Sequence, residues 1–206
     1  MWIYEKKLQY PVRIANPNPR IAGIIVEALG GPDGEVGAAM RYLNQRYTMP
    51  DGNIIATLTD IGSEELGHME ILASMMYQLT RNLTDDERRA AGFDKYFVGH
   101  GNGVFPSSAA GVPFTTMAIA SKGDAYCDLV EDLAAEQKAR VTYDNILRLS
   151  DDPDVNDAIK FLREREIVHY QRFADAIRIS QENLNSKNFY ACNPSFDKGC
   201  GKMKNC

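Results

Sequence analysis

Two short motifs with the same spacing, Glu65-x-x-His68 and Glu166-x-x-His169, hold the residues of this 206-residue chain whose types could do chemistry. Each motif places a carboxylate and an imidazole three positions apart, and on a helix this spacing puts both side chains on one face. Apolar residues flank both motifs at three- and four-residue intervals, so the motifs occupy positions that should face a core. A carboxylate is almost never fully buried unless it is paired or binds a metal. The two motifs therefore indicate a buried metal site.

Two further glutamates, Glu35 and Glu136, interrupt the apolar stripes of other segments in the same way. Glu35 precedes Glu65 by the same number of residues as Glu136 precedes Glu166, and each interval has a turn near its midpoint. Residues equally far from the turn of an antiparallel helical pair lie at one height, because every residue rises by about 1.5 Å. One Glu from each of two helices, plus Glu-x-x-His from each of two others, is the ligand set of carboxylate-bridged dinuclear sites. Two divalent ions would balance four carboxylates, and oxygen with imidazole ligands suits manganese or iron.

Other polar residues near these motifs have simpler expected roles. Either motif alone would be weak evidence, because Glu and His are common on solvated helix faces. Glu64 is expected to face outward, since the apolar stripe runs through Glu65. His100 lies in a glycine-rich loop and is expected at the surface. Arg140, one turn after Glu136, either pairs with the site carboxylates or is solvated.

The periodicity of the remaining sequence predicts the elements that must position these residues. Apolar residues recur at helical spacing in four long segments: 19–47, 53–81, 123–149 and 154–183. The short turns TMPDGN and SDDPD join them into two hairpins, and a Gly-, Pro- and Ser-rich stretch connects the hairpins. No β pattern competes. The sequence predicts an all-α, ferritin-like four-helix bundle with a long crossover between helices 2 and 3.

The stretch ALGGPDGEVGA at residues 28–38 interrupts the first helical pattern. Taken alone it indicates a turn between two short helices, because Pro32 lacks a backbone donor and each glycine costs about 1 kcal/mol relative to alanine in a helix. The matching intervals argue against a reversal of the chain here, since Glu35 could then not reach the height of Glu65. We therefore predict a kinked helix that continues, with glycines that let a neighbouring helix or a small substrate approach Glu35.

Composition bounds the other possibilities. The net charge of -5 and the absence of a basic stripe argue against nucleic acid as a partner. No apolar run suits a signal peptide or a membrane span, which predicts cytoplasmic synthesis without a signal peptide and no membrane partner. We predict a bundle domain at residues 1–184 and an irregular, cysteine-containing tail at 185–206. Besides Cys127, the cysteines are Cys192, Cys200 and Cys206, so they cannot form a disulfide framework for the fold.

Four segments also resemble the manganese catalase family. Its members carry GGxxGE, EExxH, ExxAR and ExxH motifs on successive helices, and here these segments read GGPDGE (30–35), DIGSEELGHMEI (60–71), EQKAR (136–140) and REREIVHYQRF (163–173). The resemblance extends from residue 1 to about residue 180. The start MWIYEKKLQYPV, the turn MRYLNQRYTMPD and the crossover segment AAGVPFT are similar to the short spore-coat branch of the family, the CotJC proteins.

The resemblance implies roles for these residues that spacing does not separate. The implied metal ligands are Glu35, Glu65, His68, Glu136 and His169. Glu166 is implied to lie just outside the metal shell as a proton-handling catalytic base. Some family members place an arginine immediately before the third-helix glutamate, where this chain has Ala135, and this difference bears on access to the metals.

The resemblance also implies a reaction, a cofactor and a location. It implies hydrogen peroxide disproportionation at two manganese ions per chain, in a homo-oligomer, the family's hexamer, located in the spore coat with other coat proteins. A di-iron peroxidase or oxidase would share every ligand. A mainly structural coat protein is a further alternative, because the three tail cysteines suit cross-linking.

Overall fold

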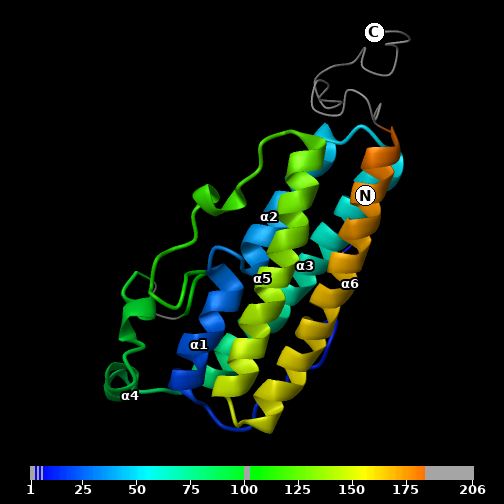
Figure 1. Cartoon of the computed structure of the whole chain (residues 1–206). Coiled ribbons are helices and arrows are strands. Elements are labelled where there is room, and N and C mark those ends of the chain that lie inside the picture. Colours follow the sequence, from blue (N-terminus) through cyan, green and yellow to red (C-terminus); the bar gives the residue numbers. More distant parts are fainter. Residues whose placement is uncertain (1–2, 4, 6, 100–102, 184–206) are drawn as a thin grey trace, which may run out of the picture.

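The chain folds into an all-α bundle of long helices (Figure 1). The computed structural model describes residues 3, 5, 7–99 and 103–183. In chain order the elements are α1 (Pro19–Gly30), α2 (Glu35–Gln45), η1 (Arg46–Thr48), α3 (Gly52–Thr80), α4 (Asp85–Ala90), η2 (Asp94–Phe97), η3 (Thr116–Ile119), α5 (Ala125–Leu149) and α6 (Pro153–Asn183). Among these residues no strand forms, and the β contacts amount to one isolated bridge between Ser107 and Pro113. The predicted fold class is confirmed.

Polar caps start the helices where the sequence predicts. The side chain of Asn18 accepts hydrogen bonds from two backbone N–H groups of the first turn of α1, and Asp51 does the same for α3. Asp124 accepts a hydrogen bond from the first turn of α5. Such caps replace the missing intrahelical partners of the first turn and contribute about 1 kcal/mol each. They fix the starts of the helices, and thereby the heights of the glutamates along them.

Two separate hydrophobic clusters fill the bundle core, one toward each end. Along α3, Ile54, Leu58 and Ile61 belong to one cluster, whereas Leu72 and Met75 belong to the other. The stretch of α3 between them carries Glu65 and His68, which are 0% exposed. On α5 and α6 the clusters likewise leave a gap at Glu136, Glu166 and His169. A polar layer therefore divides the core at mid-height, and the packing on both sides keeps water from it.

The predicted continuous first helix is wrong. Helix α1 ends at Gly30, and α2 begins at Glu35 after a break whose flanking residues Gly31 and Gly34 have extended backbones. Figure 1 shows that α2 nevertheless continues in the general direction of α1, and both helices pack on α3. The chain therefore does not reverse here, and Glu35 stands in the first turn of α2, at the height of the polar layer.

The glycines at this break make room for the crossover and for the end of α1, rather than for a neighbouring helix or a substrate. A Cβ atom on Gly30 would collide with the backbone of Pro106 and Ser107, and one on Gly31 would meet the carbonyl of Glu27. The Glu27 carboxylate also accepts a 2.6 Å hydrogen bond from the backbone N–H of Ala109. The crossover therefore lies against α1, and α4, η2 and η3 give it more helical structure than its Gly-, Pro- and Ser-rich sequence predicts.

The segment before α1 runs along α3 and α6. Gln78 of α3 donates a 3.0 Å hydrogen bond to the carbonyl of Val12 and accepts a 2.8 Å bond from the backbone N–H of Ile14. Tyr10 stacks on Phe161 of α6 with ring centroids 4.5 Å apart. Gln9 of the same segment donates a 2.7 Å hydrogen bond to Glu64, the neighbour of Glu65, so the segment reaches the α3 side of the polar layer.

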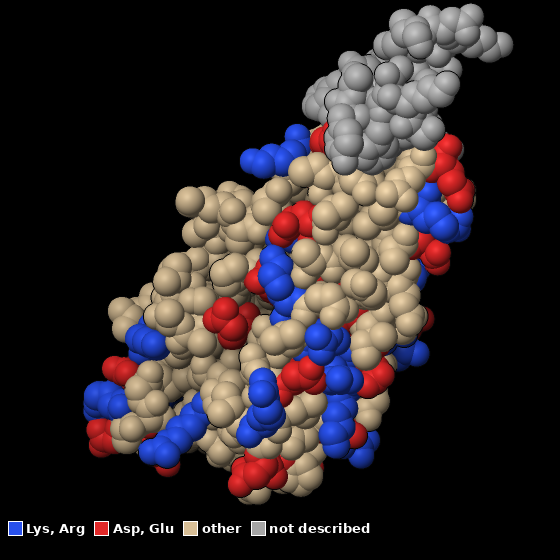
Figure 2. Space-filling model, in the orientation of Figure 1, with Lys and Arg blue, Asp and Glu red and all other residues tan. Residues whose placement is uncertain are grey.

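Other sequence predictions have different outcomes. None of the helices in the described part of the chain is long and apolar enough to span a bilayer. Figure 2 shows acidic and basic side chains interspersed on the face formed by α5 and α6. Cys127 is exposed. The predicted tail at 185–206, with its three cysteines, and His100 lie outside the described residues.

Candidate metal centre

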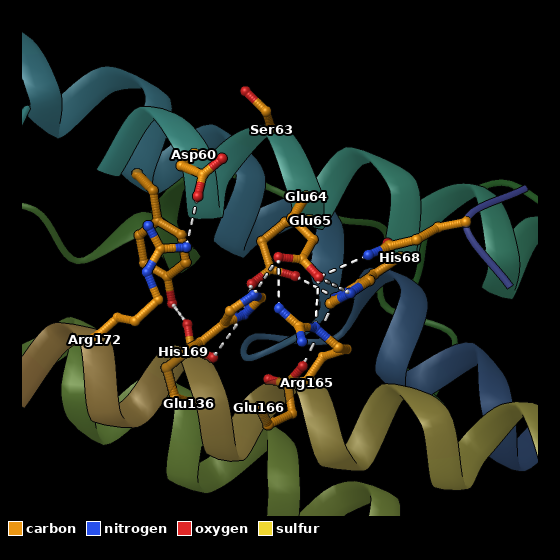
Figure 3. Close-up of polar contacts among 12 residues, drawn as sticks. Asp60, Ser63, Glu64, Glu65, His68, Glu136, Arg165, Glu166, His169 and Arg172 are labelled. Carbon is orange, nitrogen blue, oxygen red and sulfur yellow. Dashed lines mark hydrogen bonds and ion pairs between the residues drawn. The ribbon is translucent and has the colours of Figure 1, made fainter. Parts of the chain in front are cut away.

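Two glutamates and two histidines converge at the centre of the polar layer. One ligand atom from each of Glu65, His68, Glu166 and His169 can be chosen so that all four lie within 4.8 Å of one another. Glu65 stands between the imidazoles, since one of its oxygens lies 2.7 Å from His68 Nδ1 and the other 2.7 Å from His169 Nδ1. Figure 3 shows the two histidines on either side of the Glu65 carboxylate, one from α3 and one from α6. Both Glu-x-x-His motifs therefore face a common point, as the sequence predicts.

The other two predicted carboxylates lie beside this group, one at each histidine. Glu35 Oε2 lies 3.8 Å from His68 Nδ1, and Glu136 Oε2 lies 3.5 Å from His169 Nδ1. Glu65 is thus shared between the histidines, and each histidine also faces a glutamate from the other helix of its own hairpin. Glu166 lies 3.8 Å from His68 Nδ1 as well. The arrangement has two similar halves related by Glu65, which suits two cations rather than one.

The donor atoms of this cluster fit a metal because the protein leaves them unsatisfied. Nδ1 of His68, Nδ1 of His169 and both oxygens of Glu65 make no hydrogen bond with any described residue, and the same holds for Oε2 of Glu136 and Oε1 of Glu166. Their mutual contacts are short, yet lack the angles of a hydrogen bond. Leaving a buried polar atom unsatisfied costs about 1–3 kcal/mol, and more for a charged group. Imidazole nitrogens and carboxylate oxygens that point at one another in this way would be satisfied by cations of the manganese or iron type.

Two buried tyrosines donate hydrogen bonds to Glu35 and Glu136, and each tyrosine belongs to the hairpin opposite its glutamate. Tyr42 of α2 donates a 2.5 Å hydrogen bond to Oε1 of Glu136, and Tyr143 of α5 donates one to Oε1 of Glu35. The bonds cross from the first hairpin to the second and back. Both tyrosines are 1% exposed, and burial raises the pKa of each phenol well above 10, so the phenols stay protonated and remain donors. Each donated bond fixes one oxygen of a glutamate and leaves the other facing its histidine.

The prediction that Glu64 faces outward is wrong. Its carboxylate lies 3.0 Å from Nε2 of His169 and 3.5 Å from Nε2 of His68. Arg165 donates to both of its oxygens, at 2.6 and 3.1 Å, and Gln9 donates at 2.7 Å. Figure 3 shows Glu64 and Arg165 beside the two imidazoles. The carboxylate on Nε2 of His169 favours a proton there and leaves Nδ1 available to a metal at the centre, as for many metal-binding histidines. Nε2 of His68 is near the same carboxylate but makes no hydrogen bond with a described residue.

Burial and mutual charge set the protonation of the cluster. Burial and the charge of Glu65 raise the pKa of Glu35 to about 8, and burial with the charges of Glu35 and Glu136 raises the pKa of Glu166 well above its usual value. Burial alone would lower the pKa of His68, but the charge of Glu65 and contacts with other glutamates raise it well above 6.5. The pKa of His169 is raised in the same way. Without metal, this core therefore retains protons at neutral pH, and metal binding must displace them.

These shifts predict how stability depends on pH in the metal-free protein. The native state holds its proton on Glu35 up to about pH 8, whereas the unfolded chain loses it near 4.5, so the resulting stabilisation is complete below 4.5 and is lost as pH rises toward 8. Glu166 and both histidines change stability in the same direction. Since one unit of raised pKa corresponds to about 1.4 kcal/mol and 1 kcal/mol shifts Tm by about 2–4 °C, the metal-free protein should melt several degrees lower at about pH 8 than at about pH 6.

Thermal melts followed by circular dichroism, with chelator or with manganese, would measure this dependence. Metal replaces the bound protons, so the metal-loaded protein should show a weaker dependence over the same range. Glu35→Gln should reduce the slope of the metal-free protein. A metal-free melting temperature that rises with pH would contradict these protonation states.

A narrow, partly open pocket, called the channel below, lies between α2 and α5 beside the cluster. Its walls include three alanines and one buried arginine, and it reaches three of the clustered glutamates. The lining residues are Asp33, Glu35, Ala38, Arg41, Tyr42, Ala135, Glu136, Ala139 and Glu166. The free space has room for about one water molecule. Ala135, at the position before Glu136, therefore forms part of the wall of the channel along which a small molecule would reach the carboxylates.

Sequence reasoning missed the supporting residues of this site. Arg140 pairs with Gln137 and Asp144 rather than with the clustered carboxylates. Tyr42 and Tyr143 lie on the predicted apolar stripes, and their hydroxyls on such stripes were a signal that a buried acceptor is needed. Glu64 gave a weaker signal, its position four residues before His68.

Comparisons with known proteins agree with this geometry. A model of the family described as manganese containing catalase matches residues 1–191. The chain is 52% identical over 190 residues to the Bacillus subtilis protein CotJC, covering 92% of this chain and 100% of that protein. It is 34% identical to a probable manganese catalase of Clostridium acetobutylicum, covering 92% of this chain and 85% of the other.

The solved structures extend the agreement to the fold. The crystal structure of KatB, a manganese catalase from Anabaena, matches with a TM-score of 0.79 and 30% sequence identity, over 86% of this chain and 80% of that chain. A family model that spans almost the whole chain, and a solved relative of the same architecture, agree on the family. The chain belongs to the manganese-containing catalase family.

Proposed function

We propose that the chain binds two manganese ions and converts two molecules of hydrogen peroxide into two of water and one of dioxygen. The observation that carries the proposal is the set of buried, unsatisfied nitrogen and oxygen atoms around Glu65. Membership of the manganese-containing catalase family supports manganese as the metal. The proposed ligands are those that the family resemblance implies, namely Glu35, Glu65, His68, Glu136 and His169.

The geometry suggests a distribution of these ligands. Glu65 would bridge the two ions, because its oxygens face different histidines. Glu35 and His68 would supply the other protein ligands of one ion, and Glu136 and His169 those of the second ion. A bound manganese pair supplies a two-electron redox couple, which matches the electron demand of each half of the reaction.

The protein's own groups would position the substrate and move its protons. Glu166 lies beside this ligand set, with Oε1 3.8 Å from His68 Nδ1, and it holds a proton readily because its pKa is raised. We assign it the transfer of a proton between the two peroxide oxygens during O–O cleavage. The channel admits a molecule about the size of water, which suits hydrogen peroxide better than an organic hydroperoxide.

Oxygen evolution and metal analysis would test the proposal. Protein loaded with manganese should evolve one dioxygen per two peroxides, measured with an oxygen electrode, whereas iron-loaded protein should be much less active. Metal analysis of natively purified protein should find manganese. A native iron content with peroxidase or oxidase activity and no dioxygen evolution would favour the di-iron alternative, which uses the same ligands.

We also propose that the protein is a homo-oligomeric component of the spore coat. The support is its 52% identity to CotJC. A structural role in the coat can coexist with activity, and the tail cysteines Cys192, Cys200 and Cys206 would allow cross-linking. Spores that produce a chain without residues 185–206 should release it from the coat without reductant, whereas the full chain should require reductant. Light scattering would establish whether the oligomer is the hexamer expected from the family resemblance.

A further inference from the structure

A buried arginine with free donors lines the channel. Arg41 of α2 is 2% exposed, and it is among the largest fully buried side chains of the described structure. Its Nη2 donates a 2.8 Å hydrogen bond to the carbonyl of Ala118 in η3. Its Nε and Nη1 make no hydrogen bond within the described residues. Its Nη1 lies 3.9 Å from Oε1 of Glu131, which is an ion-pair distance and too long for a hydrogen bond.

A buried guanidinium with unsatisfied N–H donors is expected to bind a ligand. Arginine remains charged when buried and carries five N–H donors in a planar fork. Burying a charge is costly unless it is paired and hydrogen-bonded. Here one backbone carbonyl and one distant carboxylate satisfy only part of the fork, although the side chain lines the same narrow space as Glu35 and Glu136. Arg41 therefore lies next to the route by which a small molecule would reach the cluster, and two of its nitrogens have no hydrogen-bond partner among the described residues.

We propose that Arg41 holds the substrate in the channel by donating hydrogen bonds to the oxygens of hydrogen peroxide, and that the same donors bind small monovalent anions. The inference rests on the proposed function for its substrate, and on geometry alone for the anion. Peroxide oxygens accept hydrogen bonds and can be held by a cationic fork, while the neighbouring carboxylates would repel an anion without this positive charge. The three alanines of the wall leave room for one small molecule, so large anions should be excluded.

A purely structural role for Arg41 makes different predictions. In that case the guanidinium would serve only to offset the buried carboxylates of α5, among them Asp132, whose pKa is raised by burial despite the charge of Arg41. Removing the arginine would then lower metal content and melting temperature and leave no specific effect on anion binding. The test must therefore measure binding and metal content as well as turnover.

The experiment compares Arg41→Gln and Arg41→Lys with Arg140→Gln in full-length, manganese-loaded protein. Arg140 is a matched control, because it is an arginine of the neighbouring helix α5 that pairs with Asp144 away from the channel. Fluoride binding is measured by calorimetry and by the electron paramagnetic resonance of Mn²⁺, with perchlorate as the large anion. Steady-state oxygen evolution gives KM and kcat for hydrogen peroxide, and metal analysis gives the manganese content.

We expect Arg41→Gln to weaken fluoride binding and to raise KM, each by roughly 10- to 100-fold, because this variant loses a charge-assisted hydrogen bond. The value of kcat should change less than about threefold. Arg41→Lys should recover part of both, Arg140→Gln should behave as wild type, and perchlorate should not bind. Unchanged fluoride affinity and KM in Arg41→Gln would overturn the proposal, as would loss of manganese in both Arg41 variants. If wild type binds fluoride through Arg41 but evolves no dioxygen, the proposed function fails while the anion site stands.

Discussion

Replacement of Glu65 by glutamine is expected to remove most of the bound manganese and to abolish dioxygen evolution. Glutamine keeps the size of the side chain but carries no charge, and it turns one of the two oxygens into an NH₂ group that cannot bind a metal. Both oxygens of Glu65 face a histidine Nδ1 at 2.7 Å, so this one residue serves both halves of the cluster. Metal content should fall from about two ions per chain to well below one.

Asp60→Asn on the same helix is the control for this variant. Asp60 is largely exposed and pairs with Arg172, so the change removes the same charge from α3 without touching the cluster. Metal analysis and an oxygen electrode measure the outcome, and far-ultraviolet circular dichroism shows whether the bundle remains folded. A Glu65→Gln protein that is folded and retains wild-type manganese and turnover would contradict the assignment of Glu65 as the bridge.

Replacement of Glu166 by glutamine is expected to separate chemistry from metal binding. If Glu166 moves protons, the variant should keep its manganese and lose activity by about 10²- to 10⁴-fold, which is the usual contribution of a general acid or base. Glutamine has the same shape and can still form hydrogen bonds, but it cannot exchange a proton at neutral pH. The loss should appear mainly in kcat, because the channel walls are unchanged.

Glu164→Gln is the matched control, since Glu164 is exposed on the same helix and pairs with Arg163. This control should retain full activity. Glu166 contributes an atom to the group of four possible ligand atoms that lie within 4.8 Å of one another, so a direct role in metal binding is the competing assignment. Loss of one manganese ion from Glu166→Gln would establish that competing role and exclude the proton-transfer assignment.

Much of the fold and the clustered residues follow from the sequence. Helical periodicity gave the elements, and the short turns gave the antiparallel hairpins. Matching intervals placed Glu35 level with Glu65, and Glu136 level with Glu166, which the structure confirms by bringing all four around two histidines. Rise per residue alone determines such heights, and it does not depend on neighbouring helices. The break between α1 and α2 could not be predicted in this way. The height of Glu35 shows only that the chain does not reverse before it, and not whether the helical hydrogen bonds continue from α1 into α2.

The sequence by itself determined that four glutamates and two histidines occupy the polar layer, because burial patterns and residue types are local properties of each helix. Only the tertiary structure decided how they pair: that Glu65 stands between histidines of two hairpins, that Tyr42 and Tyr143 cross between hairpins, and that Glu64 faces both imidazoles. It also decided that Arg41 lines the channel beside Ala135. These contacts depend on the rotation of each helix about its axis and on side-chain rotamers, which the packing of all four helices sets together and which no single helical period contains.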